Sequence, residues 1–253
     1  MPVKFSTSIK NQSSLFIGSQ PIRKLFIGNT LHWQKVLAVK YGAIYTRDAA
    51  WGTAANSIFS SDDWHLPVSN DINTLFYDGI YTRYPFNPPY ALLGAEHLKE
   101  VGAAYWTDVN PHTNYMKFNA RAAGYSNGYS FYGLKTAAFW WKASNYGNEA
   151  NWVISNYSNE WGGGAIMSPY WSMAIRIIKN STTLTHGQEG TYSGNDGRIY
   201  RTICIGNEEW LADNLAETKF RNGNLITVLP ANQMHTAAAL CYPNDDINNF
   251  LIN

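Results

Sequence analysis

Short apolar runs joined by polar turns dominate the hydrophobic pattern of the chain. Runs rich in β-branched and aromatic residues predict strands at Gly124–Tyr129, Phe139–Trp141 and Met173–Ile178. A further strand is predicted at Ile199–Ile205, and the turn signal Gly206-Asn207 leads from it into another. Long loops rich in Gly, Asn and Pro join these runs.

Helical periodicity is confined to one short stretch. Ser69–Asp71 supplies capping side chains, and the apolar residues that follow have i, i+3, i+4 spacing: Ile72, Leu75 and Phe76. We therefore predict an α+β, β-rich fold with one or two short helices.

The N-terminal part contains a short internal sequence repeat. The apolar run Ser14–Ser19 is repeated ten positions later as Lys24–Asn29, and Gln20-Pro21 lies between the copies. This pattern predicts two strands joined by a turn, in a small N-terminal β-unit of residues 1–34. Two such strands are too small to bury their apolar face alone, so we expect the unit to pack on another chain.

Charge and composition exclude several classes of partner. The 253 residues carry 19 basic and 18 acidic side chains, for a net charge of +1, with no block of like charge. Nucleic-acid grooves and anionic-membrane surfaces need a basic patch, so neither is expected. No apolar run approaches the ~20 residues of a membrane span, so membrane insertion is not expected either.

No catalytic or metal-binding motif is readable in the sequence. The six histidines lack metal-ligand spacing, and His65 is interpreted as structural. Asp62-Asp63 and Asp245-Asp246 are isolated pairs without the alternate-residue spacing of a calcium loop. Nucleophile elbows, P-loops and dinucleotide fingerprints are also absent from the sequence. We therefore predict a non-enzymatic protein with no cofactor and no metal.

The last quarter of the sequence resembles a known family. Asp196–Leu215, followed by Phe220–Ile226 and Cys241–Asp246, is similar to the opening of the Fibrobacter succinogenes major paralogous domain. Segments similar to its later landmarks occur earlier in this chain, at Tyr41–Tyr45, Asp63–Pro67, Gly94–Lys99, Ala123–Gly128 and Phe139–Ser144. The resemblance implies a scaffold similar to C-type lectins, preceded here by the small β-unit.

The displaced order of these segments has two interpretations. In the first, the module is circularly permuted: residues 194–253 complete the scaffold built by 35–179, through a connector at 180–193. In the second, two modules stand in tandem and the second is truncated. The first is preferred, because a half-module of this size buries little core and loop closure costs little. It predicts that Ile199–Ile205 shares a sheet with Met173–Ile178 and that Trp210 is buried against 35–179.

The same resemblance leads to expectations about disulfide formation and calcium binding. The family often has a cysteine four residues before its Trp-His pair, available to pair with one near Cys241, but Ser60 stands at that position here. No disulfide is therefore expected, and Cys204 is interpreted as a small buried hydrophobe. The Glu-Pro-Asn loop of calcium-dependent lectins is also missing, so calcium binding has no support.

The segment from Asn145 to Trp171 has the composition of a binding surface. It alternates amides, aromatics and small residues, a mixture typical of antibody paratopes and suited to glycans. The resemblance places the usual ligand face in this region. Trp140, Trp141 and Trp152 are expected in the core. The candidate ligand-binding residues are Tyr146, Asn148, Asn156, Tyr157, Asn159 and Trp161.

Composition and resemblance together lead to a functional expectation. Amide- and aromatic-rich chains are typical of displayed binding proteins, yet Met1–Thr7 has no apolar stretch of a secretory signal. Lys24–Trp33 resembles the opening of many phage tail and fibre proteins. We expect a virion protein, assembled in the host cytoplasm and displayed on the particle exterior, that recognises a bacterial surface glycan or protein.

The expected partners follow from the same assignment. Residues 1–34 would contact other virion proteins, in a fibre, a tail or a capsid decoration. A homo-oligomer is expected, with a trimer as the assumed state because phage fibres are commonly trimeric. Two alternatives stay open: a purely structural virion cement protein, and a bacterial cell-surface protein of the same family.

Overall fold

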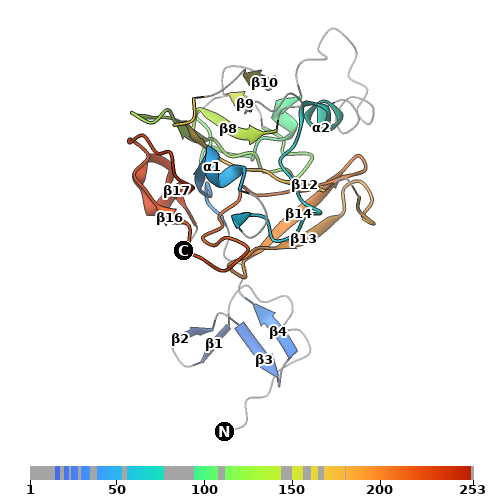
Figure 1. Cartoon of the computed structure of the whole chain (residues 1–253). Coiled ribbons are helices and arrows are strands. Elements are labelled where there is room, and N and C mark those ends of the chain that lie inside the picture. Colours follow the sequence, from blue (N-terminus) through green and yellow to red (C-terminus); the bar gives the residue numbers. More distant parts are fainter. Residues whose placement is uncertain are drawn as a thin grey trace, which may run out of the picture. The chain divides into compact units, whose positions relative to one another are not determined.

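The computed structural model divides the chain into two compact units, Met1–Leu37 and Ala38–Asn253 (Figure 1). It describes the backbone of four short strands between residues 15 and 34, and residues 39–52, 56–76, 94–107, 112–143, 150–155, 161–164, 168–179 and 181–251. For residues 150 and 161–164 it describes the backbone alone.

The small unit contains two separate hairpins. Strand β1 (Leu15–Ile17) pairs with β2 (Gln20–Ile22), and β3 (Lys24–Ile27) pairs with β4 (Thr30–Gln34). Each repeat copy contains a strand, as predicted, but the predicted turn at Gln20-Pro21 is wrong, because both residues belong to β2. Each copy opens its own hairpin, with only two residues between the paired strands, and a two-residue connection favours pairing of adjacent strands.

The larger unit is built on a nine-stranded sheet. Its strand order is β10-β9-β8-β6-β11-β5-β17-β16, and β7 lies off this path and also pairs with β6. Most pairs are antiparallel, whereas β6–β8 and β16–β17 are parallel. The strands are β5 (Ile44–Thr46), β6 (Ala123–Ser126), β7 (Phe131–Leu134), β8 (Ala137–Lys142), β9 (Ala150–Ser155), β10 (Trp161–Gly164), β11 (Ser172–Met173), β16 (Thr227–Val228) and β17 (Ala239–Cys241).

A second, four-stranded sheet joins the C-terminal segment to the rest of this unit. Its order is β12 (Ile178–Lys179), β15 (Glu208–Leu211), β14 (Ile199–Ile205) and β13 (Glu189–Ser193). The predicted strand Met173–Ile178 is divided: Met173 belongs to β11 of the nine-stranded sheet, and only its end, in β12, shares a sheet with Ile199–Ile205, through β15. The predicted shared sheet is therefore confirmed for Ile178 alone. Trp210 is fully buried, 5.9 Å from the Phe118 ring, as predicted for packing on the earlier segment.

The helices are short, which confirms the α+β, β-rich class. Helix α2 covers Ser69–Thr74, in the stretch where the sequence predicted a helix. Helix α1 covers Arg47–Ala50, where no helix was predicted. The Asp71 carboxylate caps α2 by accepting a hydrogen bond from the Val68 amide at 2.7 Å. Three 3-10 turns lie at η4 (Ala95–His97), η5 (Pro243–Asp245) and η6 (Ile247–Asn249). Within the described ranges, no helix has the length and apolarity needed to cross a bilayer.

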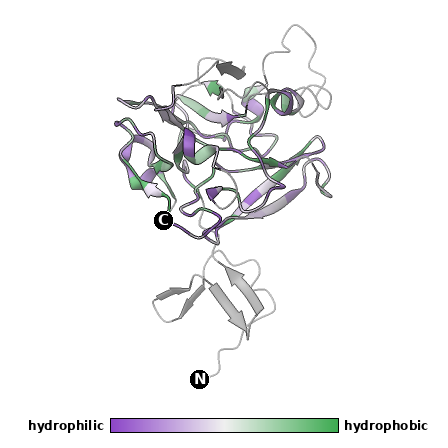
Figure 2. Cartoon of the chain, viewed as in Figure 1, coloured by the Kyte–Doolittle hydropathy of each residue, from purple (hydrophilic) through white to green (hydrophobic). Residues whose placement is uncertain are grey.

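Tryptophans form the centre of the larger unit. Trp140, Trp141 and Trp152 are fully buried, as predicted. Trp140 stacks on Trp152 with ring centroids 4.3 Å apart. Figure 2 shows hydrophobic and hydrophilic residues interspersed over the larger unit. Buried aromatic pairs of this kind add to the stability gained from the hydrophobic area they bury.

Candidate functional site

Most of the predicted ligand-binding residues lie outside the described part of the chain. These are Tyr146, Asn148, Asn156, Tyr157 and Asn159. Trp161 is the first residue of β10, where its backbone pairs with Ile154 of β9. Their role as ligand contacts therefore stays a prediction.

A groove of about 610 Å³ lies beside α1, where the sequence indicated no site. We call it the α1 groove. Its walls combine two aromatic rings, an acid and a base, an amide and a small residue: Trp51, Phe220, Asp48, Arg47, Asn56 and Ala238. Arg47 and Trp51 are four residues apart on one helical turn, so both reach the same side.

Trp51 is held rigidly in the groove wall. Its ring meets the buried Trp141 edge to face, with centroids 5.2 Å apart. Trp141 is itself fixed, because its indole nitrogen donates to the Tyr45 carbonyl at 2.8 Å. A ring that is already ordered loses little conformational entropy when a ligand stacks on it.

The polar wall of the α1 groove is an ion pair. The Arg47 guanidinium lies 2.9 Å from Asp48 Oδ1, and the two side chains are 35% and 41% exposed. Asn222 Nδ2 also donates to Asn56 Oδ1 at 3.1 Å. The groove thus offers both donors and acceptors next to aromatic surface, which is the usual composition of a small-molecule site.

Three stacked rings form a second aromatic feature, which we call the aromatic column: Tyr132, Tyr125 and Trp171. Tyr125 stacks on Tyr132 with centroids 5.6 Å apart and on Trp171 with centroids 4.9 Å apart. Tyr132 is 46% exposed. Burial raises the pKa of the Tyr125 hydroxyl, and the neighbouring Tyr132 raises it further, so the hydroxyl is a neutral hydrogen-bonding group.

Gly124 allows this column to form. Its φ is +70°, and a Cβ atom there would lie 2.3 Å from the Tyr132 carbonyl oxygen and 2.6 Å from the Phe131 ring. Only glycine tolerates both the left-handed backbone and the close approach of β7. Tyr125 can therefore lie directly opposite Tyr132 in the β6–β7 pair.

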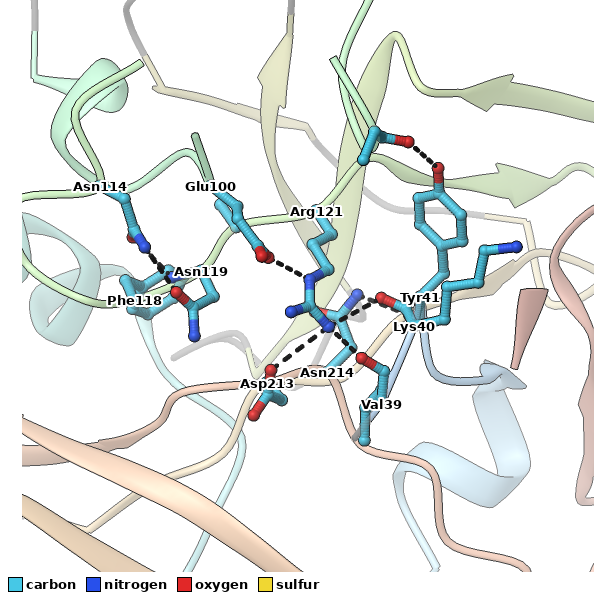
Figure 3. A network of polar contacts seen from close by, with 12 residues as sticks. Val39, Lys40, Tyr41, Glu100, Asn114, Phe118, Asn119, Arg121, Asp213 and Asn214 are labelled. Atoms are coloured by element: carbon cyan, nitrogen blue, oxygen red, sulfur yellow. Dashed lines mark hydrogen bonds and ion pairs between the residues drawn. The ribbon is translucent and has the colours of Figure 1, made fainter. Parts of the chain in front are cut away.

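Two buried arginines, Arg121 and Arg176, hold distant segments of the chain together. Arg121 forms ion pairs with Glu100 and Asp213 and donates to the carbonyls of Val39 and Lys40 (Figure 3). Because its guanidinium is buried among these partners, we interpret Arg121 as structural rather than catalytic.

Arg176 plays the same part closer to the centre of the fold. It is fully buried and donates to the carbonyls of Phe118, Asn119 and Leu211 and to Asn214 Oδ1. Burial lowers the pKa of Arg176 to about 9, so the side chain still carries its charge at neutral pH. These bonds tie Leu211 and Asn214 of the C-terminal segment to the chain between β11 and β12.

The described residues offer no evident metal centre or reactive thiol. They contain no group of three His, Cys, Asp or Glu side chains placed to hold a metal ion. Cys204 and Cys241 are buried thiols, and burial raises the pKa of Cys241 to about 12. His65 lies 3.8 Å from the Asp71 carboxylate, and its backbone pairs with Ile178.

Comparison of the chain with protein-family models, curated proteins and solved structures finds no match.

Proposed function

We propose that the chain is a non-enzymatic subunit of a phage particle, in a fibre, a tail or a capsid decoration. Its larger unit recognises a glycan or protein on the bacterial surface. The observation that carries this proposal is the rigid, partly exposed aromatic surface formed by the α1 groove and the aromatic column. Exposed aromatic surface next to polar groups is typical of recognition sites.

The sheet topology supports the proposed lectin-like scaffold. In the family that the chain resembles, the opening and closing strands of the module are neighbours. Here β14 and β15 correspond to that opening and β12 to the close, and β12 pairs directly with β15. This pairing favours a circularly permuted module over a truncated tandem copy, because residues 194–253 share one compact unit with residues 38–179.

The small unit is proposed to attach the chain to the particle. Its hairpins each contain only two strands, and isolated two-stranded hairpins are marginally stable in water. Contact with other virion proteins, or with sister copies in a trimer, would supply the missing burial.

Two measurements test the proposal. Mass spectrometry of particles produced by the encoding genome should detect the chain, and excess purified chain should block adsorption of those particles to host cells. A chain that is present in the particle but does not block adsorption would favour the cement alternative. A chain found in the bacterial envelope and missing from particles would favour the cell-surface alternative.

A further inference from the structure

We infer that the α1 groove and the aromatic column form one continuous face that binds a linear, uncharged oligosaccharide. This inference rests on the proposed recognition function and names its ligand class.

The two features are joined along β8. Phe139 and Trp141 are two residues apart on that strand, so their side chains lie on the same face, about 7 Å apart. Phe139 contacts Tyr125 of the column with ring centroids 4.4 Å apart, and Trp141 contacts Trp51 of the groove at 5.2 Å. Because Trp141 is fully buried, this row of rings joins the groove to the column beneath the surface.

The pairing of β11 with β5 brings the same two features together from another direction. Ser172 lies opposite Thr46 in this antiparallel pair. Trp171 of the column directly precedes Ser172, and Arg47 of the groove directly follows Thr46. Because the pair is antiparallel, Trp171 and Arg47 therefore lie at the same end of these two strands. The partly buried rings of both features also pack on one core cluster.

The chemistry of this face suits sugar rings. A pyranose has an apolar face of C–H groups, which carry partial positive charge and are attracted to the negative face of an aromatic ring. Its hydroxyls need both donors and acceptors at the rim. The Tyr125 and Tyr132 hydroxyls provide these at the column, and the Arg47–Asp48 pair provides them at the groove.

The charge and the length of this face restrict the class of ligand further. Single-stranded nucleic acid also stacks on aromatic rings, but its binding requires a positively charged groove. Among the described residues that line the α1 groove, the one cation is Arg47, and it is paired with Asp48, so the face does not favour a polyanion. The three rings of the column have centroid spacings of 5.6 and 4.9 Å and lie next to a groove of about 610 Å³, so the face is longer than one sugar ring. The face thus fits a chain rather than a single terminal sugar.

Calorimetric titration of the full chain tests this inference. The probes are linear glucans, mannans, xylans and chito-oligosaccharides, each from monosaccharide to octamer. We expect at least one series to bind, with affinity that rises at least tenfold from the monosaccharide to the tetramer. Trp51→Ala and Tyr132→Ala should each weaken binding about tenfold or more, because central aromatic anchors dominate such contacts.

Two further variants keep the result interpretable. Trp51→Phe retains a ring on Trp141 and should bind within a few-fold of the unsubstituted chain, even if Trp51→Ala unfolds. Tyr115→Ala removes a tyrosine that is 58% exposed elsewhere, against His97, and should leave binding unchanged.

Length-independent binding, or binding that survives both alanine substitutions, would overturn the inference. So would failure of every series to bind while the purified chain still blocks particle adsorption. That last outcome would still support the recognition function, but with a protein or another class of molecule as the ligand.

Discussion

The Tyr200 hydroxyl donates a hydrogen bond to Glu217 Oε1 across 3.0 Å in the interior of the larger unit. The Asp196 amide donates to the other oxygen of the same carboxyl at 3.1 Å. Glu217 is fully buried, and burial together with the nearby Asp196 carboxylate raises its pKa to about 8. The Arg198 guanidinium, 3.5 Å from Asp196, opposes this rise only in part.

This carboxyl should make the stability of the fold depend on pH. Its pKa is about 8 in the folded chain against 4.5 ordinarily, so the fold binds a proton that the unfolded chain releases. The stabilisation is complete below pH 4.5 and is lost as pH rises towards 8, at about 1 kcal/mol per pH unit. Urea unfolding across this range should show that slope, and Glu217→Gln should flatten it. An unchanged slope in the variant would contradict the assignment.

Replacing Arg176 should destabilise the larger unit strongly. Arg176→Met removes the donor to three buried backbone carbonyls and one of the two donors to Asn214 Oδ1, which keeps its bond from Trp140. We expect a loss of about 3 kcal/mol or more in unfolding free energy. The matched control is Arg201→Met, which removes a half-exposed arginine 3.3 Å from Asp213. It should cost less than about 1 kcal/mol. Equal effects of the two substitutions in chemical denaturation would refute the structural role of Arg176.

Gly124→Ala should damage the aromatic column. The new Cβ would meet the Tyr132 carbonyl at 2.3 Å, so β6 and β7 must separate. Gly187→Ala is the control, because Gly187 also has a positive φ, +84°, but has open space around it. The control should cost about 1–2 kcal/mol from backbone strain alone, and Gly124→Ala clearly more. Thermal unfolding of both variants measures the difference, and similar losses would count against the close β6–β7 approach.

The C-terminal segment and the earlier strands should unfold together. Trp210 contacts the Phe118 and Trp152 rings at 5.9 and 6.3 Å, so removing it opens a cavity in the shared core. Trp210→Ala should cost about 3–5 kcal/mol and shift a single transition of the larger unit. Two separate transitions, with only one affected by the substitution, would show that residues 194–253 form their own domain.

Local sequence signals account for much of the fold. Helix α2 and strand β14 were predictable because the cap, the periodicity and the turn residues lie next to each other in the chain. The pairing of β14 with β15 followed from the Gly206-Asn207 turn between them. The strand pairing of the small unit was mispredicted, because two apolar runs of similar sequence do not reveal which segment each will pair with.

The candidate site was less accessible to sequence reasoning. The α1 groove assembles residues from three distant segments, around Trp51, Phe220 and Ala238, and none of these carries a motif for ligand binding or catalysis. The aromatic column likewise depends on register, since Tyr125 meets Tyr132 across a hairpin and Trp171 through β11. Composition favoured residues 146–161, because this segment is rich in aromatic and amide side chains. Composition alone does not show which side chains lie next to one another in the folded chain.

The most direct measurement of the recognition role is a dose-response competition for adsorption. Purified chain is added to host cells before particles from the encoding genome, and free particles are counted. The unsubstituted chain and Tyr115→Ala should inhibit adsorption at the same concentration. The double variant Trp51→Phe/Tyr132→Ala, with its folded state verified by thermal melting, should need at least tenfold more protein. Equal inhibition by the folded double variant would contradict the assignment of this face as the recognition surface.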